Sequence, residues 1–221
     1  MNFLSLSLLD SDKLSLFQRK LVQDDLEWLD GKLTAGEQAA VVKQNRQLNP
    51  ESDLACELSS VVKTQLCSTP LVKSFSLIRK VHSVLVSSCN HGDGYGWHVD
   101  NPFSKHGRRD ISFTVFLSNL DDYEGGGLEI QGVQETSLFR LPAGHVVMYP
   151  SSSLHRVQPV SRGTRYACVG WIESYVQAEE DRSLLFNLDA GARGLLARYG
   201  RSDELDLVFQ SYTNAVRRLS R

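Results

Sequence analysis

Two histidines and an aspartate have the residue types and the spacing of a metal site. His98 and Asp100 are two positions apart in the segment GYGWHVD, and His155 lies in a separate segment, PSSSLHRV. Because side chains at i and i+2 of a strand point to the same face, we expect His98 and Asp100 to leave one strand side by side. Two histidines and one carboxylate can form the facial triad of non-haem Fe(II) oxygenases. The pattern therefore predicts a metal site.

An arginine follows the third candidate ligand. Arg165 lies ten positions after His155, across the turn segment VSRG. We expect the two residues to occupy neighbouring antiparallel strands and to face each other. A guanidinium can form a two-pronged salt bridge with a carboxylate, so we interpret Arg165 as the anchor for the distal carboxylate of 2-oxoglutarate. The alternative is a sheet-edge arginine paired with a local acid.

Thr114 and Tyr95 are candidate contacts of the same cosubstrate. Thr114 lies on a predicted strand in which alternate side chains share a face, so its hydroxyl could donate a hydrogen bond to the distal carboxylate beside Arg165. Tyr95 precedes His98 by three positions. Strict alternation turns Tyr95 away from His98 unless the GYG segment is irregular, and we keep it as a candidate on that condition.

The segment NPFSKHGRR follows Asp100 directly and is predicted to form a loop at the rim of the site. Its Lys105, Arg108 and Arg109 could attract an acidic substrate, but we interpret them as solvated surface charges. We interpret Trp171 as core or pocket wall, because a large aromatic side chain is usually buried for packing.

The residues around these candidates form short β-rich segments. Glycines, prolines and small polar residues separate the segments, as turns require. The predicted strands span residues 81–89, 95–100, 111–117, 128–131, 137–141, 145–149, 154–157 and 165–172. About eight short strands at this spacing predict an antiparallel sandwich or jelly roll.

Helical patterns flank the β-rich part. Apolar residues recur at turn spacing from Ser11 to Gly31, again after the candidate N-cap Ser52, and from Asp181 to the carboxyl end, where Ser202 is placed to cap the last helix. The sequence therefore predicts a mainly β fold with flanking helices. We expect residues 1–180 to form one domain and residues 181–221 a C-terminal helical extension.

The composition is that of an ordinary globular protein and argues against several partners. The 221 residues carry 24 basic and 26 acidic side chains, for a net charge of −2, which is not the basic footprint that nucleic-acid binding requires. The four cysteines form no CxxC pair and are predicted to be free thiols. The first ten residues do not resemble a signal peptide, and no apolar run is long enough to span a membrane. We therefore expect a cytoplasmic protein without membrane or nucleic-acid partners.

Five segments carry longer motifs. They read YGWHVDNP, RRDISFTVFLSNLDDYEGGGLEI, LPAGHVVMYPSSSLHRVQPVSRGTRYACVGWIES, WLDGKLTAGEQAAVVKQNRQL and RYGRSDE. These segments resemble the bacterial PKHD-type hydroxylases, which are Fe(II)- and 2-oxoglutarate-dependent dioxygenases related to prolyl 4-hydroxylases. The resemblance extends over nearly the whole chain, from Trp28 to the carboxyl terminus.

The resemblance implies a fold and an activity. It implies that His98, Asp100 and His155 bind Fe(II), that Arg165 holds 2-oxoglutarate, and that the core is a double-stranded β-helix, or jelly roll. It implies that dioxygen hydroxylates an unactivated C–H bond with release of succinate and CO2. A prolyl residue of a protein or peptide is the leading substrate, and L-ascorbate is an additional cofactor. The amphipathic last helix is compatible with a monomer or a homodimer.

Two positions depart from the family pattern. Cys89 stands nine positions before His98, where the family usually has a tyrosine, and Gly127 stands where it usually has a glutamate. Neither residue is a proposed ligand, so we expect both changes to affect pocket shape and substrate identity rather than the type of reaction.

Two other function classes remain open on the sequence. A cupin-like metal enzyme that does not use 2-oxoglutarate has no need of Arg165. A non-catalytic binding module is disfavoured by the intact set of three ligands. A halogenase is disfavoured because its carboxylate position must be vacant for chloride, whereas Asp100 fills it.

Overall fold

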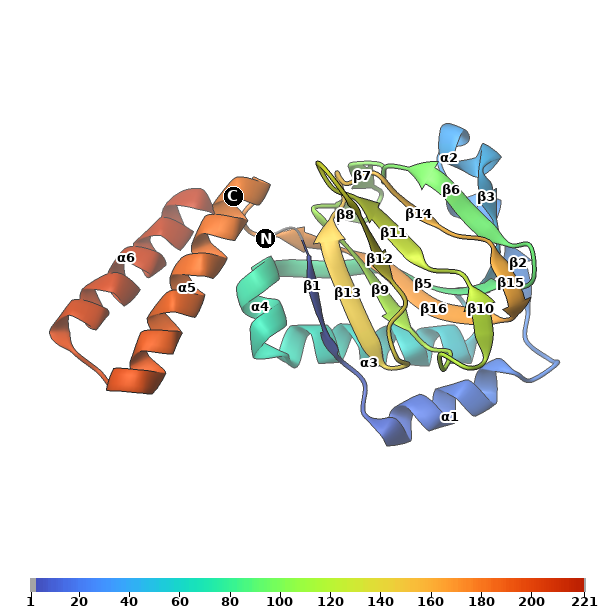
Figure 1. Cartoon of the computed structure of the whole chain (residues 1–221), viewed down its shortest axis with the longest axis horizontal. Coiled ribbons are helices and arrows are strands. Elements are labelled where there is room, and N and C mark those ends of the chain that lie inside the picture. The colour runs from blue at the N-terminus through green and yellow to red at the C-terminus, as the bar shows by residue number, and fades with distance from the viewer. Residues whose placement is uncertain (1–2, 221) are drawn as a thin grey trace.

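Two antiparallel sheets form the centre of the molecule (Figure 1). The computed structural model describes residues 3–220, without the side chain of Gln38. Among these residues, the larger sheet has seven strands, in spatial order β1 (Leu4–Ser7), β13 (His145–Pro150), β9 (Ile111–Phe116), β16 (Arg165–Ser174), β5 (Ile78–Cys89), β4 (Arg46–Leu48) and β2 (Trp28–Asp30). The smaller sheet has five, in the order β12 (Thr136–Phe139), β11 (Leu128–Gln131), β14 (His155–Val157), β6 (Gly94–His98) and β3 (Lys43–Gln44).

Two short pairs complete the strands. β10 (Tyr123–Gly125) pairs with β15 (Val160–Gly163), and β7 (Phe103–Ser104) pairs with β8 (Gly107–Arg108). β10 lies where the chain passes from the larger sheet to the smaller one, and β15 lies where it returns. The second forms part of the loop that follows Asp100.

The helices are α1 (Ser11–Leu21), the 3₁₀ helix η1 (Gly31–Thr34), α2 (Glu37–Val41), α3 (Asp53–Ser68), α4 (Pro70–Ser76), α5 (Glu179–Tyr199) and α6 (Asp203–Leu219). Helices α1, α3 and α4 flank the larger sheet, η1 and α2 lie beside β3 of the smaller sheet, and α5 and α6 extend beyond the sheets (Figure 1). The Ser52 hydroxyl caps α3 by accepting a hydrogen bond from the Ala55 amide, 3.3 Å away. α5 and α6 form a hairpin that projects away from the sheets (Figure 1).

The main hydrophobic core lies between the larger sheet and α1 and α3. Leu58, Val62 and Leu66 of α3 are fully buried, and they follow the spacing at which helical side chains share one face. On the sheet side, Val115 and Ile172 belong to the same cluster of buried apolar residues. This packing leaves the other face of the larger sheet opposite the smaller sheet, where polar residues gather.

The prediction of antiparallel strands flanked by helices is confirmed, but the first predicted helix is too long. α1 ends at Leu21, and Trp28 lies on β2 with Leu48 as its Cα partner on β4. Glu27 and Asp30 would place negative charge in the last turn of a helix that ended at Gly31, where the helix dipole disfavours it. The Trp28 ring also packs against Tyr166, with ring centroids 5.8 Å apart. Tertiary packing therefore places this segment in the sheet.

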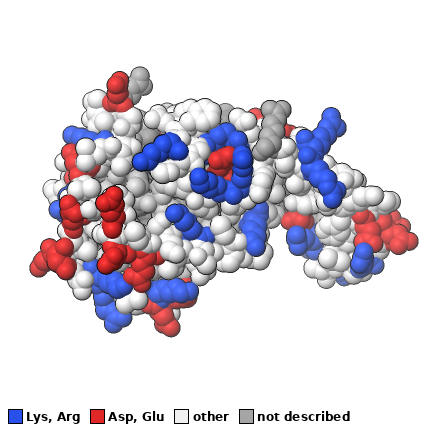
Figure 2. All heavy atoms as spheres, turned by 180° about the vertical axis from the view of Figure 1, so that it is seen from behind, with Lys and Arg blue, Asp and Glu red and all other residues white. Residues whose placement is uncertain are grey.

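None of the helices within residues 3–220 is long and apolar enough to cross a lipid bilayer. On the face behind the view of Figure 1, Lys and Arg side chains are scattered over the middle, and acidic side chains gather at the end away from the helical hairpin (Figure 2). The basic side chains on this face do not form the continuous stripe that phosphate-backbone binding uses. The four cysteines are free thiols, as predicted.

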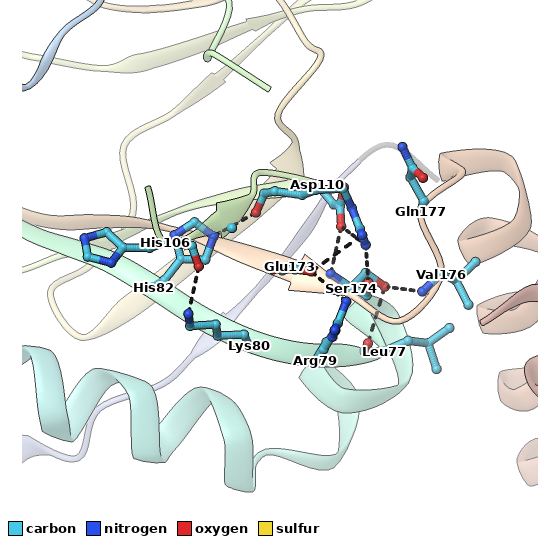
Figure 3. Close-up of polar contacts among 12 residues, drawn as sticks. Leu77, Arg79, Lys80, His82, His106, Asp110, Glu173, Ser174, Val176 and Gln177 are labelled. Atoms are coloured by element: carbon cyan, nitrogen blue, oxygen red, sulfur yellow. Dashed lines mark hydrogen bonds and ion pairs between the residues drawn. The ribbon is translucent and has the colours of Figure 1, made fainter. Parts of the chain in front are cut away.

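A polar network ties the loop after Asp100 to the end of β16 (Figure 3). The Asp110 carboxylate accepts hydrogen bonds from the Ser174 amide at 2.8 Å and from the Arg108 guanidinium at 3.2 Å. Arg108 also donates to the Ser174 carbonyl at 2.7 Å and lies 3.5 Å from Glu173. Arg182 of α5 donates to the Val176 carbonyl. The interpretation of Arg108 as a solvated charge is therefore wrong.

Replacing Asp110 with alanine is expected to lower the free energy of unfolding by about 3 kcal/mol, because it leaves the largely buried Arg108 charge without this partner. Urea denaturation followed by circular dichroism measures the change. The control is Glu124→Ala, which removes an exposed ion pair to Arg162 and should cost less than about 1 kcal/mol. Equal losses in the two variants would show that the network does not stabilise the fold.

Candidate active site

The structure brings His98, Asp100 and His155 together between the two sheets. Their candidate ligand atoms all lie within 4.8 Å of one another. His98 and His155 are Cα partners on β6 and β14, and their ring centroids are 4.2 Å apart. Asp100 Oδ2 lies 3.9 Å from Nε2 of His155. Two imidazoles and one carboxylate at these separations can bind a single metal ion.

Both imidazoles are oriented with Nε2 available for a metal. Nδ1 of His98 lies 2.8 Å from the Gly96 carbonyl, and Nδ1 of His155 lies 2.9 Å from the Ser153 carbonyl. Nδ1–H therefore donates in each case, which leaves the lone pair on Nε2. Burial, together with the nearby His155, lowers the pKa of His98 to about 4. His98 is thus neutral at pH 7, as metal ligation requires.

Asp100 is positioned by residues from the larger sheet, and not by the strand that carries His98. β6 ends at His98, so Asp100 does not lie on the strand as expected, although both side chains reach the same site. Oδ2 of Asp100 accepts hydrogen bonds from the Ser112 hydroxyl at 2.6 Å and from Nε1–H of Trp171 at 2.9 Å. Ser112 and Trp171 are Cα partners on β9 and β16. Trp171 therefore does more than form the pocket wall that we expected: it holds a candidate metal ligand.

Replacing Trp171 with phenylalanine is expected to weaken metal binding by about 10-fold to 100-fold, the usual cost of losing an outer hydrogen bond to a ligand. The change removes the N–H donor to Asp100 and keeps an aromatic ring. Competition against a coloured chelator measures the affinity. Trp97→Phe is the matched control, because Trp97 is exposed and lies next to His98 in sequence; equal affinities for both variants would contradict the role of Trp171.

Arg165 lies on the opposite sheet from His155. It begins β16, where its Cα partner is Cys89 on β5, whereas the strand of His155 pairs with β11 and β6. The expectation that the two residues occupy neighbouring strands is therefore wrong. The intervening residues form β15, which pairs with β10 and carries the chain between the sheets. Arg165 and His155 nevertheless line the same cavity.

The Arg165 guanidinium is buried without the partners that a charge requires. The residue is 2% exposed, and neither Nε nor Nη2 has a hydrogen-bond partner within residues 3–220. The alternative of a sheet-edge arginine paired with a local acid is therefore wrong. Burying an unpaired guanidinium is unfavourable, so its orphaned donors point to an anionic ligand. A dicarboxylate such as 2-oxoglutarate fits this donor set.

Thr114, Tyr149 and Cys89 line the cavity together with Arg165. Burial strongly raises the pKa of Tyr149, so the phenol keeps its proton. The Tyr149 and His155 rings form a T-shaped pair, with ring centroids 5.0 Å apart. Tyr149 was not predicted as a site residue, although it lies two positions after Val147 on the buried strand β13, which places both side chains on one face.

Of the two departures from the family pattern, one lies in the cavity and the other does not. Cys89 is 3% exposed and lines the cavity, so the small thiol leaves space where a tyrosine ring would stand. Gly127 lies outside the cavity lining, and a Cβ atom there would approach Leu138 Cδ1 to 2.5 Å. A glutamate at this position would therefore require the Leu138 side chain to move.

Tyr95 is brought to His98 by an irregularity in β6. His155 pairs with His98, and Val157 pairs with Tyr95. A three-residue interval on β6 therefore lies opposite a two-residue interval on β14, which is a β-bulge. This bulge places Tyr95 on the same side as His98, and the two rings stack with centroids 3.5 Å apart. The condition under which Tyr95 was a candidate is met, and its ring restrains the orientation of His98.

Comparison with known proteins agrees with this geometry. The sequence model of the 2OG-Fe(II) oxygenase superfamily matches residues 84–173. A PKHD-type hydroxylase of Synechococcus sp. (strain CC9605) is 64% identical over 221 residues, which is 100% of both chains. The chain belongs to the PKHD-type hydroxylase family. Another member, from Prochlorococcus marinus (strain MIT 9313), is 53% identical over 212 residues, 96% of each chain.

Solved structures show the fold that this hydroxylase shares. A Pseudomonas putida prolyl-4-hydroxylase has a TM-score of 0.55 at 19% identity, over 78% of this chain and 92% of that one. A prolyl hydroxylase of Trichoplax adhaerens has a TM-score of 0.58 at 20% identity, over 83% of this chain and 86% of that one. It was solved with a peptide fragment of the hypoxia inducible factor oxygen degradation domain. The predicted jelly-roll core is thereby confirmed.

Family membership decides between the function classes that the sequence left open. This hydroxylase is an oxidoreductase, and the family implies Fe(II) and 2-oxoglutarate. The non-catalytic binding module is therefore wrong, and the buried unpaired Arg165 argues against an enzyme without 2-oxoglutarate.

Proposed function

We propose that this protein hydroxylates an unactivated C–H bond of a prolyl residue in a protein or peptide, and that it releases succinate and CO2. His98, Asp100 and His155 would hold Fe(II), and Arg165 would hold the distal carboxylate of 2-oxoglutarate. The observation that carries the proposal is the buried, unpaired Arg165 in the same cavity as the triad. Arg165 supplies an anion site, which a metal enzyme that does not use 2-oxoglutarate would not need.

The residues of the chain contribute binding and orientation. When bound, Fe(II) and 2-oxoglutarate supply the oxidation of the C–H bond with dioxygen, and three protein ligands leave three coordination positions for them. Arg165 neutralises the distal carboxylate, and Thr114 can donate a hydrogen bond to it. Ser112 and Trp171 hold Asp100 by two hydrogen bonds, so this ligand is oriented before a metal arrives.

The surface near the site supports a peptide substrate. Trp97 and Val99, on either side of His98, are 39% and 47% exposed, and Phe103 is 64% exposed. Exposed apolar side chains of this size are typical of protein-binding surfaces. The Trichoplax relative in fold carries a peptide in its structure.

The test is a pair of peptides that differ only by proline or alanine, each incubated with the enzyme, Fe(II), 2-oxoglutarate and air. We expect the prolyl peptide alone to gain one oxygen atom by mass spectrometry, with one succinate formed per oxygen gained. Oxygen gain in both peptides would show that proline is not the target. Succinate without modification of any peptide in a screen would contradict a peptide substrate.

We also propose that residues 1–180 form the catalytic domain and residues 181–221 a helical extension. Met1, Asn2 and Arg221 at the ends of these ranges lie outside the described residues. Phe186 of α5 packs against Phe75 with ring centroids 5.6 Å apart, and Asp189 accepts a hydrogen bond from Ser74 at 2.6 Å. Cytoplasmic location, the use of L-ascorbate and a monomeric or homodimeric state stay predictions.

A further inference from the structure

Two cationic side chains line the cavity of the triad but have no role in the proposed chemistry. They are Lys43 on β3 and Arg109, which follows β8. Within residues 3–220, neither forms an ion pair with a carboxylate. Arg109 is partly buried, so its interpretation as a solvated charge is wrong. The question is what these two charges bind.

Lys43 is a buried charge with a neutral partner. Its residue is 6% exposed, and Nζ donates a hydrogen bond to the Thr34 hydroxyl at 3.0 Å. Nζ also lies 5.2 Å from the centroid of the Tyr95 ring, which stacks on His98. Burial lowers the pKa of Lys43 to about 8. A lysine kept in this position without an anion is unfavourable, so the site favours an anionic ligand.

Arg109 lines the cavity beside Trp171. Its Cζ lies 3.9 Å from the centroid of the Trp171 ring, and its Nε is buried without a hydrogen-bond partner. Arg108 and Asp110 on either side are held by the network of Figure 3. Each cation therefore contacts an aromatic ring that also contacts a candidate metal ligand: Trp171 donates to Asp100, and Tyr95 stacks on His98.

The charges of the loaded site explain why 2-oxoglutarate is not the anion for these two cations. The two charges of Fe(II) and the one of Arg165 are balanced by Asp100 and the two carboxylates of 2-oxoglutarate. Lys43 and Arg109 then remain uncompensated beside the metal. A third carboxylate, from the substrate, would offset one of these two charges and could accept hydrogen bonds from both side chains.

We propose that the substrate carries a carboxylate close to the residue that is hydroxylated, and that Lys43 and Arg109 bind this carboxylate. The inference rests on the proposed function and specifies its substrate class. An acidic side chain and a free carboxyl terminus offer the same chemistry. The experiment therefore separates these two sources.

The test measures binding by calorimetry to enzyme loaded with Mn(II) and saturated with 2-oxoglutarate. The probes are acetyl-Ala-Pro-Glu-amide, acetyl-Ala-Pro with a free carboxyl terminus, and the neutral acetyl-Ala-Pro-Gln-amide. We expect at least one acidic probe to bind about 10-fold or more tightly than the neutral one, as hydrogen bonds to charged groups predict. The acidic probe that binds more tightly identifies the source of the carboxylate.

Lys43→Met and Arg109→Met should each remove this preference, whereas Lys105→Met, an exposed lysine of the same loop, should keep it. Thermal unfolding checks that each variant is folded. The visible band of anaerobic Fe(II) with 2-oxoglutarate should persist in all three variants, which separates this inference from the proposed function. The inference is overturned if the three probes bind equally to the wild type, or if none of them binds. It is also overturned if Lys43→Met and Arg109→Met both keep the preference for an acidic probe. Loss of the visible band in Lys43→Met would overturn it as well.

Discussion

Replacing Asp100 with alanine is expected to weaken Fe(II) binding by more than about 100-fold and to abolish detectable turnover. Loss of an outer-shell partner already costs up to about 100-fold in metal affinity, and loss of a direct ligand should cost more. Asp100 is the one anionic member of the triad, and it lies within 3.9 Å of His155. The variant also leaves the Ser112 hydroxyl and the Trp171 N–H without their shared acceptor. Competition against a coloured chelator measures the affinity, and succinate formation measures turnover.

The matched control is Asp121→Ala, which removes an exposed carboxylate outside the cavity. We expect this variant to bind Fe(II) and to turn over 2-oxoglutarate like the wild type. Retained turnover in Asp100→Ala would count against a metal site formed by His98, Asp100 and His155.

Replacing Arg165 with methionine is expected to weaken 2-oxoglutarate binding by about 30-fold or more, because truncating one partner of a buried charge pair costs about 2 kcal/mol or more. The same change should leave the ligand-free protein as stable as the wild type, or more stable. The reason is that Nε and Nη2 of Arg165 are buried without partners, and removing an unpaired buried charge relieves a cost. Calorimetric titration and thermal unfolding measure the two effects.

Arg162→Met serves as the control for Arg165. Arg162 is exposed and forms an exposed ion pair with Glu124 on β10, so its loss should change neither 2-oxoglutarate affinity nor stability by much. If Arg165→Met destabilised the ligand-free protein strongly and kept full 2-oxoglutarate affinity, Arg165 would be a structural residue.

The features that the sequence predicted correctly are encoded locally. Alternation and turn residues located the strands, and residue types and spacing selected His98, Asp100 and His155. The helix caps Ser52 and Ser202 were also predictable, since each accepts from an amide three residues ahead.

The features that the sequence did not reveal depend on pairing between distant segments. Trp171 reaches Asp100 because β16 pairs with β9 in a register that places Trp171 opposite Ser112. Arg165 faces the triad from another sheet because β15 leads the chain across. Tyr95 stacks on His98 through a bulge that strict alternation does not anticipate. Periodicity within one segment carries no information about such registers.

The central claim is that one cavity holds Fe(II) at the triad and 2-oxoglutarate at Arg165. The direct test is anaerobic addition of Fe(II) and 2-oxoglutarate to the purified protein, followed by visible absorption. We predict the charge-transfer band of the chelate in the wild type and its loss in Asp100→Ala. A wild-type protein that is folded by circular dichroism and gives no band at saturating concentrations of both would contradict the claim.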